Sequence, residues 1–434
     1  MKYHIITIGC QMNKADSERI AGYLEDLGYE WTKSRTQADL VVLTTCGVRQ
    51  SAEDRIYGLI SKIKKENKFA TRRSKILLTG CLSEREDVRK RLKGEVDIWL
   101  PAREISRLAE KLNPPHRQLA SPSQKGTEVF DYLKLRPKRN SKFSAFVPIG
   151  NGCNNFCSYC VVPYARGREV YRSADEIIKE LEGLIKKGCK EINLIAQNVN
   201  SYVSSQKSKI INFPNLLKLA DKIPGDFWIR FATSHPKDMS DDLIDVISEC
   251  DKVCKYVHLP VQSGDNEILD KMNRKYMVEH YKGLIKKIRK KIPKVAVSTD
   301  IIVGFPGETE EQFKNTLKLF QEIEYDLAYI AQYSSRYGTE AAKMADNISL
   351  KEKRRRNDIL EDLLRKTALA NNKKQLGREL RVLVEGKDRK DFWKGKTETY
   401  KNVRVKSDGL KAGDFVQVKI NKADVFGLEG EVVN

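Results

Sequence analysis

Three cysteines in one short segment are the first chemistry that the sequence offers. Cys153, Cys157 and Cys160 form the pattern CxxxCxxC within NGCNNFCSYC, directly after an apolar run that is typical of a strand. Three thiolates at this spacing can each cap one iron of a 4Fe–4S cluster and leave the fourth iron without a protein ligand. An open iron can bind a small molecule, as the open position of a catalytic zinc does. A zinc site or a chance spacing is the alternative.

A second set of cysteines is spread along the first hundred residues. Cys10, Cys46 and Cys81 end the apolar segments HIITIGC, LVVLTTC and KILLTGC. Because the carboxyl ends of parallel strands meet at one edge of a sheet, we expect these thiols to lie together and hold a second cluster. Three buried structural cysteines are the alternative, since free cysteine packs well as a small apolar residue.

The remaining cysteines carry no comparable pattern. Cys189, Cys250 and Cys254 are interpreted as structural, because the CxxxC spacing of the last two has no third partner nearby. The total of nine cysteines is odd, the chain is long and nothing suggests export, so metal or redox chemistry is a better default than disulfides.

The elements that position these cysteines follow from apolar periodicity, which predicts an α/β protein. Short strands alternate with helices over the first hundred residues, as in a parallel sheet. From Phe143 about six larger βα units indicate a full or partial barrel. A charged helix over 350–374 then leads to a small β-barrel. The expected strands are 3–8, 39–44, 75–79 and 96–100, then 143–149, 191–196, 227–232, 255–259, 296–303 and 328–333, and finally 379–384, 398–405, 415–420 and 428–433.

Composition bounds the partners and the compartment. The 434 residues carry a formal charge of +21, which favours a polyanionic partner, most simply nucleic acid, over a generic lysine-rich surface. We find no apolar run of about 18 residues, so no membrane span is expected. The first residues lack the layout of a signal peptide, and a cytoplasmic protein is expected.

The local spacing of the CxxxCxxC segment, with Tyr159 just before its last cysteine, resembles the radical S-adenosylmethionine superfamily. The resemblance implies that the open iron chelates the amino and carboxylate groups of S-adenosylmethionine. It also implies that one electron from the cluster breaks a carbon–sulfur bond and releases a 5′-deoxyadenosyl radical.

Motifs over essentially the whole chain are more specific. The segments GCQMNKADSERIAGYLEDLGY, TTCGVRQSAEDRI, TGCLSER, GCNNFCSYCVVPYARGREVYRS, AQNVNSY, HLPVQSGDNEILDKMNRKY and STDIIVGFPGETEEQF resemble the methylthiotransferases, and GCQMN is most similar to the MiaB type. The resemblance implies an N-terminal methylthiotransferase domain over 1–115, a linker over 116–138, a radical core over 139–370 and a TRAM RNA-binding domain over 371–434.

The same resemblance implies a reaction. Cys10, Cys46 and Cys81 would bind an auxiliary 4Fe–4S cluster whose open iron holds the sulfur that is methylated and transferred. One S-adenosylmethionine would supply the methyl group and a second the radical, which takes hydrogen from carbon 2 of N6-isopentenyladenosine at tRNA position 37. That C–H bond is not acidic, which is the physical reason for a cofactor radical.

Polar residues after the barrel strands are the candidate contacts for S-adenosylmethionine. Amides in the segment QNVN could bind its amino group, and other strand ends could reach its ribose or carboxylate. Simple strand-ending turns are the alternative. The candidates are Tyr159, Gln197, Asn198, Arg230, Ser234, Gln262 and Val303, the last beside the turn GFPGE.

Basic residues interleaved with aromatic ones are the candidate RNA contacts. Arg378, Arg381 and residues 396–404 alternate with Phe392, Trp393 and Tyr400, which suits phosphate contact and base stacking. Arg166 and Arg168 are candidates for RNA phosphate or for the charge of the cluster, and the KRRR run over 353–356 for a charged face.

The expected partners are the tRNA anticodon stem-loop, S-adenosylmethionine and an electron-donating reductase, and the expected state is a monomer. Methylthiotransferases that act on threonylcarbamoyladenosine or on a ribosomal-protein aspartate are the near alternatives. A non-catalytic RNA-binding protein with structural zinc is the alternative from another class.

Overall fold

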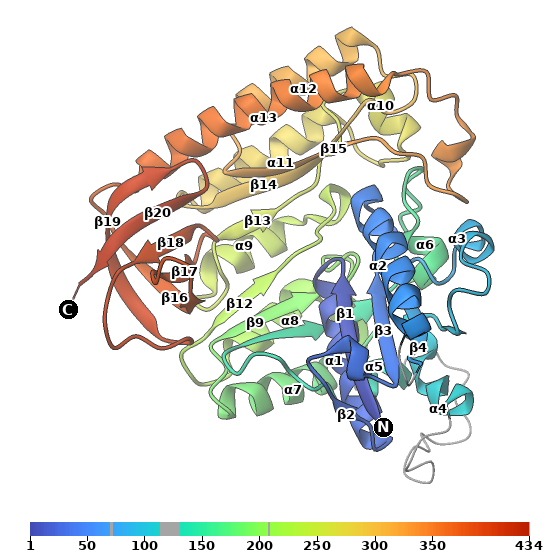
Figure 1. Cartoon of the computed structure of the whole chain (residues 1–434). Helices are drawn as coiled ribbons and strands as arrows, with labels where there is room; N and C mark the ends of the chain where they lie inside the picture. The colour runs from blue at the N-terminus through green and yellow to red at the C-terminus, as the bar shows by residue number, and fades with distance from the viewer. Residues whose placement is uncertain (70–72, 113–130, 207–208, 434) are drawn as a thin grey trace.

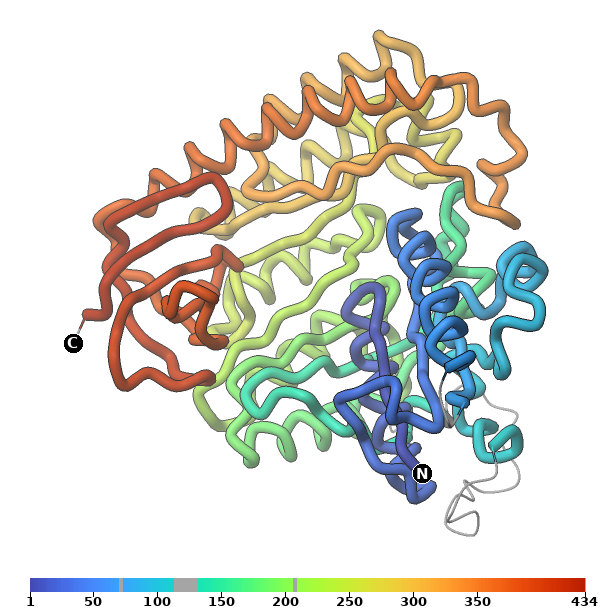
Figure 2. The backbone as a smooth tube through the Cα atoms, viewed as in Figure 1, coloured from blue at the N-terminus to red at the C-terminus, as the bar shows by residue number. Residues whose placement is uncertain are grey.

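The computed structural model describes residues 1–69, 73–112, 131–206 and 209–433, arranged as three parts (Figure 1). The N-terminal part, blue in Figure 1, lies beside the green strands of the central part, and the red C-terminal barrel lies at the far end of those strands. The backbone trace in Figure 2 shows the same arrangement. None of the helices in these ranges is both long and apolar enough to cross a bilayer.

The N-terminal part is a parallel sheet, as predicted. Its strand order is β2 (Glu30–Trp31), β1 (Lys2–Ile8), β3 (Leu40–Thr45), β4 (Lys75–Gly80) and β5 (Ile98–Trp99), and every pair is parallel. Helix α1 (Gln11–Asp26) packs in one apolar core of the domain and α2 (Gln50–Phe69) in the other. Only β5 is clearly shorter than the sequence predicts.

The register of this sheet places its strand ends side by side. Ile8 pairs with Thr45, and Thr45 pairs with Gly80. Cys46 and Cys81 follow the last two directly, and Cys10 follows Ile8 after one glycine. The three cysteines therefore lie at one edge of the sheet.

The central part is an open barrel of six parallel strands, which confirms the partial (βα)6 prediction. One half has the order β12 (Trp228–Phe231), β9 (Glu191–Ile195), β6 (Ser144–Pro148), and the other has β13 (Tyr256–His258), β14 (Ala296–Val303), β15 (Leu327–Gln332). A single parallel bridge between Ile229 and Val253 joins the halves. The helices are α6 (Val162–Arg166), α7 (Ala174–Lys186), α8 (Phe213–Asp221), α9 (Asp241–Glu249), α10 (Asn266–Lys271), α11 (Val278–Lys291) and α12 (Glu310–Ile323).

Helix α13 (Leu350–Lys373) runs from the barrel to a closed five-stranded C-terminal barrel. Its order is β16 (Glu379–Lys387), β17 (Trp393–Thr397), β18 (Asn402–Val405), β20 (Gly427–Val432), β19 (Phe415–Asp424). Four pairings are antiparallel, and β18 with β20 is parallel. The expected strand over 398–405 is wrong in its first half, because Thr397 Oγ1 accepts from the Lys401 amide and closes a turn there.

The expected linker over 116–138 is described only from residue 131, and residues 113–130 lie outside the described part. Its described end packs against the first domain. In α5 (Asp131–Lys134), Tyr132 and Leu133 are buried in the same apolar core as α1. Lys138 forms an ion pair with Glu25 of α1. The described end of the linker is therefore packed against the first domain through Tyr132, Leu133 and Lys138.

Substitution of Gly80 tests whether the ends of β3 and β4 must approach one another this closely. It has φ +88°, and a Cβ there would lie 2.3 Å from the Thr45 carbonyl oxygen. We expect Gly80→Ala to lower the free energy of unfolding by about 3 kcal/mol, from backbone strain plus overlap. Gly94 has φ +76° with open space around it, so Gly94→Ala should cost only about 1 kcal/mol. Urea unfolding of both variants measures this, and equal losses would contradict the close approach.

Candidate active site between two cysteine sets

Cys10, Cys46 and Cys81 are here called the sheet set. Asn13 of the GCQMN motif links two of their positions. The Asn13 Oδ1 accepts from the Cys10 amide at 3.2 Å, and its Nδ2 donates to the Thr45 carbonyl at 3.0 Å. Asn13 is fully buried, so these bonds join the turn of Cys10 to the strand end that precedes Cys46. The motif is a structural bridge between two of the cysteines.

The thiols of the sheet set influence one another. Burial first, then the Cys81 thiol and to a smaller degree Cys10, raises the pKa of Cys46 to about 11. Burial also raises the pKa of Cys10, against the charge of Arg166 and with a contribution from Cys81. Groups interact in this way only when they are close, so the predicted meeting of the three cysteines is found.

Cys153, Cys157 and Cys160, here called the loop set, follow β6 at the end of the barrel. Phe156 has φ 47°, and its carbonyl accepts from Asn273 Nδ2 at 2.9 Å. Burial raises the pKa of Cys153 to about 11, with Cys157 among the smaller causes. Burial, then Cys157, Cys153 and Cys81, raises the pKa of Cys160. The contribution of Cys81 to the pKa of Cys160 indicates that the two sets lie near one another.

The two sets also approach one another closely. A Cβ placed on Gly47 would lie 3.1 Å from Cys81 Cβ and 3.3 Å from Val161 Cγ2. Gly47 follows Cys46, and Val161 follows Cys160. The backbone beside Cys46 therefore lies close to the side chain beside Cys160.

The donor sets suit clusters in which each thiolate binds a separate iron. Among the described residues, no three His, Cys, Asp or Glu side chains are grouped as ligands of a single metal ion would be. Cluster ligands stand around a cube of iron and sulfur, so they need not converge on one point. Arg274 adds a cation here, with Nη1 3.5 Å from Cys157 Sγ.

Among the described residues, three buried polar atoms without hydrogen-bond partners lie beyond the ends of β9 and β12. They are Gln197 Oε1, Asn198 Oδ1 and Ser234 Oγ, all predicted contacts for S-adenosylmethionine. Their strands end in register with β6, because Pro148 pairs with Ile195, and Leu194 with Phe231. An unsatisfied buried polar group costs about 1–3 kcal/mol, so these atoms fit a polar ligand beside the loop set.

Hydrogen bonds hold these two turns in place. Asn198 Nδ2 donates to Asp238 at 2.8 Å. Asn200 donates to the His235 carbonyl at 3.0 Å and accepts from the His235 amide at 2.9 Å. Burial, then Arg274 and Lys237, lowers the pKa of His235 to about 2, so this histidine is neutral at ordinary pH. The turns are thus built before a ligand arrives.

Three other predicted contacts occupy the same end of the barrel. Gln262 has φ 73° and forms a parallel bridge to Ile301 of β14. Val303 ends β14, with its side chain in the main core. Tyr159 packs in an apolar cluster that contains Phe305 of the GFPGE turn.

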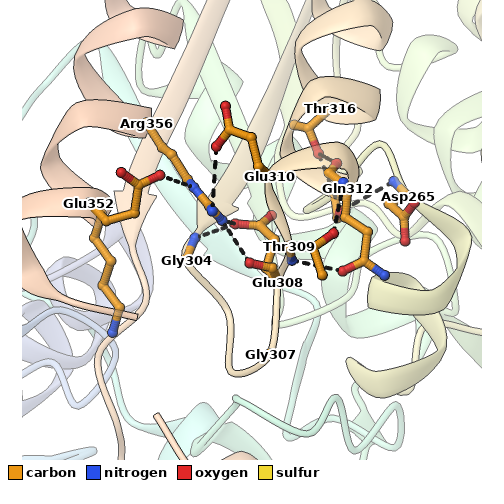
Figure 3. A network of polar contacts seen from close by, with 12 residues as sticks. Asp265, Gly304, Gly307, Glu308, Thr309, Glu310, Gln312, Thr316, Glu352 and Arg356 are labelled. Carbon is orange, nitrogen blue, oxygen red and sulfur yellow. Dashed lines mark hydrogen bonds and ion pairs between the residues drawn. The ribbon is translucent and has the colours of Figure 1, made fainter. Parts of the chain in front are cut away.

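The GFPGE turn is clamped from α13 (Figure 3). The Glu308 carboxylate accepts from the Gly304 amide at 2.6 Å and from Arg356 Nη1 at 2.7 Å. Figure 3 shows Arg356 between Glu352 and Glu310 as it reaches Glu308. Gly304 itself packs on Lys353, since a Cβ there would lie 2.4 Å from Lys353 Cγ. The interpretation of the KRRR run as a charged face is thus wrong for its two buried members, Lys353 and Arg356.

The Arg230 side chain is engaged away from the predicted contacts for S-adenosylmethionine. Its Nε donates to Glu191 at 2.6 Å, and Nη1 and Nη2 donate to the carbonyls of Glu398 and Thr397. Glu191 begins β9, so Arg230 points toward the end of the barrel opposite the cysteines. It joins the barrel to the C-terminal domain, and sequence position relative to the strand end could not reveal this direction.

Some basic and aromatic residues of the C-terminal domain contact the barrel, and others are exposed to solvent. Arg381 pairs with Asp226, Lys401 pairs with Asp326, and Tyr400 stacks on Tyr256 at 4.8 Å, all across the boundary with the barrel. The expectation of RNA contact is therefore not supported for these three. Basic side chains that remain exposed include Arg378, Arg389, Lys390 and Lys394.

Two buried arginines near the cysteines were missed or misassigned from sequence. Arg274 lies in the quoted segment MNRKY, but nothing in its spacing marked it as a neighbour of Cys157. Arg166 was a candidate for RNA phosphate or for the charge of the cluster, and its buried side chain does not support contact with RNA phosphate. Arg168 is exposed and lies over the ring of Phe156.

Three family models match successive parts of the chain. They are the uncharacterized protein family UPF0004 over residues 2–101, the radical SAM superfamily over 147–320 and the TRAM domain over 373–433. The chain is an enzyme of the radical SAM type, a type that uses a 4Fe–4S cluster and S-adenosylmethionine.

Curated relatives match the whole chain. Proteins named tRNA-2-methylthio-N(6)-dimethylallyladenosine synthase from Clostridium novyi and Syntrophomonas wolfei are each 42% identical over 100% of this chain and cover 96% and 98% of their own lengths. Among solved structures, the radical S-adenosylmethionine methyltransferase TsrM from Kitasatospora setae shares the fold at 14% identity, with a TM-score of 0.51 over 76% of this chain and 72% of that one. The chain belongs to the family of the tRNA-2-methylthio-N(6)-dimethylallyladenosine synthases.

Proposed function

We propose that this protein adds a methylthio group to carbon 2 of N6-isopentenyladenosine, also called dimethylallyladenosine, at position 37 of tRNA. The full-length similarity to synthases of that name supports the substrate. The observation that carries the chemistry is the close approach of the two cysteine sets at Gly47, Cys81 and Val161. Sulfur transfer needs a sulfur-bearing site beside a radical-generating site, and the two sets adjoin.

The loop set would hold the 4Fe–4S cluster that binds S-adenosylmethionine, and the sheet set an auxiliary 4Fe–4S cluster. When bound, the cluster of the loop set and its S-adenosylmethionine would supply the radical that removes hydrogen from the base. The auxiliary cluster would supply the sulfur, and two S-adenosylmethionine molecules would be used per turnover. The chain's own residues orient these groups. Arg274 stands beside Cys157, and Asn13 fixes the turn of Cys10.

Gln197, Asn198 and Ser234 would contact S-adenosylmethionine through their unpartnered atoms. Tyr159, Gln262 and Val303 would line the same site by position, from the loop set and the ends of two further segments. Each of these atoms or residues lies at the carboxyl ends of the barrel strands, where ligands bind in folds of this kind.

The domain boundaries proposed are 1–115, 116–138, 139–370 and 371–434. The partner would be the tRNA anticodon stem-loop, with the TRAM domain contributing exposed basic residues such as Arg378, Lys390 and Lys394. A monomer that works in the cytoplasm with an electron-donating reductase completes the proposal.

Iron analysis tests the two clusters. Anaerobically reconstituted protein should contain about eight irons, from two 4Fe–4S clusters. Replacing Cys153, Cys157 and Cys160 by Ala should remove half of this iron, and replacing the sheet set should remove the other half. Cys189→Ala is the matched control, since Cys189 Sγ donates to the Phe143 carbonyl and lies in the barrel core. Loss of all or none of the iron in either triple variant contradicts the assignment.

Ser234 separates binding from stability. Because its hydroxyl is buried without a partner, Ser234→Ala should leave the ligand-free protein as stable as before or more so by about 1 kcal/mol. Binding of S-adenosylmethionine should weaken about tenfold through one lost hydrogen bond. Ser74 is the control, because its hydroxyl donates to the Ala38 carbonyl at 2.6 Å. Ser74→Ala should lose about 1 kcal/mol of stability and keep its affinity, as measured by thermal unfolding and calorimetry.

Mass spectrometry of tRNA from a deletion strain tests the substrate. The 2-methylthio derivative of isopentenyladenosine should disappear, and unmethylthiolated isopentenyladenosine should accumulate. Reintroducing the wild-type gene should restore the product, and reintroducing the loop-set variant should not. Persistence of the product in a strain without a second copy of the gene would sink the proposal. Loss of a threonylcarbamoyladenosine derivative or of a ribosomal-protein modification instead would indicate a related substrate.

A further inference from the structure

One buried guanidinium crosses the boundary between the two domains that carry the cysteine sets. Arg166 ends α6, shortly after Cys160, and is 5% exposed. Its Nη2 donates to Asp16 Oδ2 of α1 at 2.6 Å, and its Nη1 donates to Asn151 Oδ1 of the barrel at 3.1 Å. Cys10 is the N-cap of the same helix α1. Arg166, which follows the loop set in the chain, is thus paired with the helix that begins at Cys10 of the sheet set.

The charge of Arg166 is directed at the sheet set. Burial alone would lower its pKa, but Asp16 first, then Cys81 and Cys10 among the remaining groups, raises it well above its ordinary value. The geometry agrees, because Asp16 stands on the helix that Cys10 caps, and α6, which Arg166 ends, is capped by Val161 beside Gly47. Neither Cys46 nor any cysteine of the loop set is among the largest influences on Arg166.

Asp16 supplies the charge that opposes this cation. It is 2% exposed, and its Oδ1 has no hydrogen-bond partner among the described residues while Oδ2 carries the ion pair. A buried pair of this kind is expensive to desolvate, so packing stability alone is a weak reason for it. The need for a positive charge beside a nearby anion would account for the presence of this pair.

A 4Fe–4S cluster with three thiolate ligands carries net negative charge, and reduction adds one more unit. A second anionic cluster nearby makes that electron costlier, and a buried cation beside the first cluster makes it cheaper, because Coulomb interactions are strong at low dielectric. We propose that Arg166 is a positioning residue that raises the reduction potential of the auxiliary cluster at Cys10, Cys46 and Cys81, with Asp16 as the opposing charge. The inference rests on the proposed function, which places a cluster there.

The experiment uses full-length protein, reconstituted anaerobically, with potentiometric titration followed by electron paramagnetic resonance. Arg166→Met removes the charge but keeps much of the side-chain bulk, and it should shift the potential of the auxiliary cluster to more negative values. Asp16→Asn removes the opposing charge and should shift it to more positive values. Arg166→Lys keeps the charge and should stay nearest to wild type. The cluster of the loop set should move less in every variant.

Arg172→Met is the matched control. Arg172 is also buried and forms an ion pair with Glu180 at 2.6 Å, but its Nη1 also donates to the Pro148 carbonyl, so these contacts lie within the barrel and not at α1. This variant should lose stability without shifting either potential. A purely mechanical role of Arg166 predicts instead that Met and Lys variants behave alike and that no shift of opposite sign appears.

The outcomes separate the two levels of proposal. Wild-type protein with only about four irons would refute the auxiliary cluster itself. About eight irons with unchanged potentials, or with shifts of the same sign in Arg166→Met and Asp16→Asn, would refute the role of Arg166 and leave the proposed function standing. If Arg166→Met does not fold, Asp16→Asn and Arg166→Lys still decide the sign.

Discussion

Parallel strands that end in register are the constraint on which the rest of this structure depends. Ile8, Thr45 and Gly80 are partners across the N-terminal sheet, and Pro148 with Ile195 and Leu194 with Phe231 repeat the arrangement in the barrel. Every turn that carries a cysteine, an amide or a hydroxyl of the site starts from one of these aligned ends. A shift of one residue would turn side chains to the opposite face of the sheet and separate the ligands.

The two sheets must also face each other, and buried ion pairs fix how they do so. Arg166 joins Asp16 across the boundary, and Arg336 after β15 donates to Gln50 at 2.8 Å beside Glu53 of α2. Such pairs cost desolvation energy and stabilise only when their geometry is good. They therefore act best as devices that select one arrangement of the domains, which a site assembled from two domains requires.

The third domain is connected to the barrel by two routes. Arg230 links Glu191 of the barrel to the backbone of the C-terminal domain, and Lys401 pairs with Asp326. Helix α13 leads into that domain from the GFPGE turn, where Arg356 and Lys353 contact Glu308 and Gly304. The surface that remains exposed for RNA is thus held at a set position relative to the barrel.

The sequence by itself determined the three-part architecture and both cysteine sets. Apolar strands alternating with helices specify a parallel sheet, and residues that follow such strands must gather at its edge, so Cys10, Cys46 and Cys81 could be grouped before any coordinates. Gln197, Asn198 and Ser234 were found by the same rule, and their unpartnered atoms agree with it.

Only the tertiary structure decided the direction and partner of each long charged side chain. Arg230, Arg166 and Arg356 were all expected at ligands or surfaces, and all three are buried in ion pairs with residues far away in the chain. Periodicity reports whether a position lies on a strand or a helix. It does not report where a flexible guanidinium ends, because that depends on which carboxylate another part of the fold brings within reach.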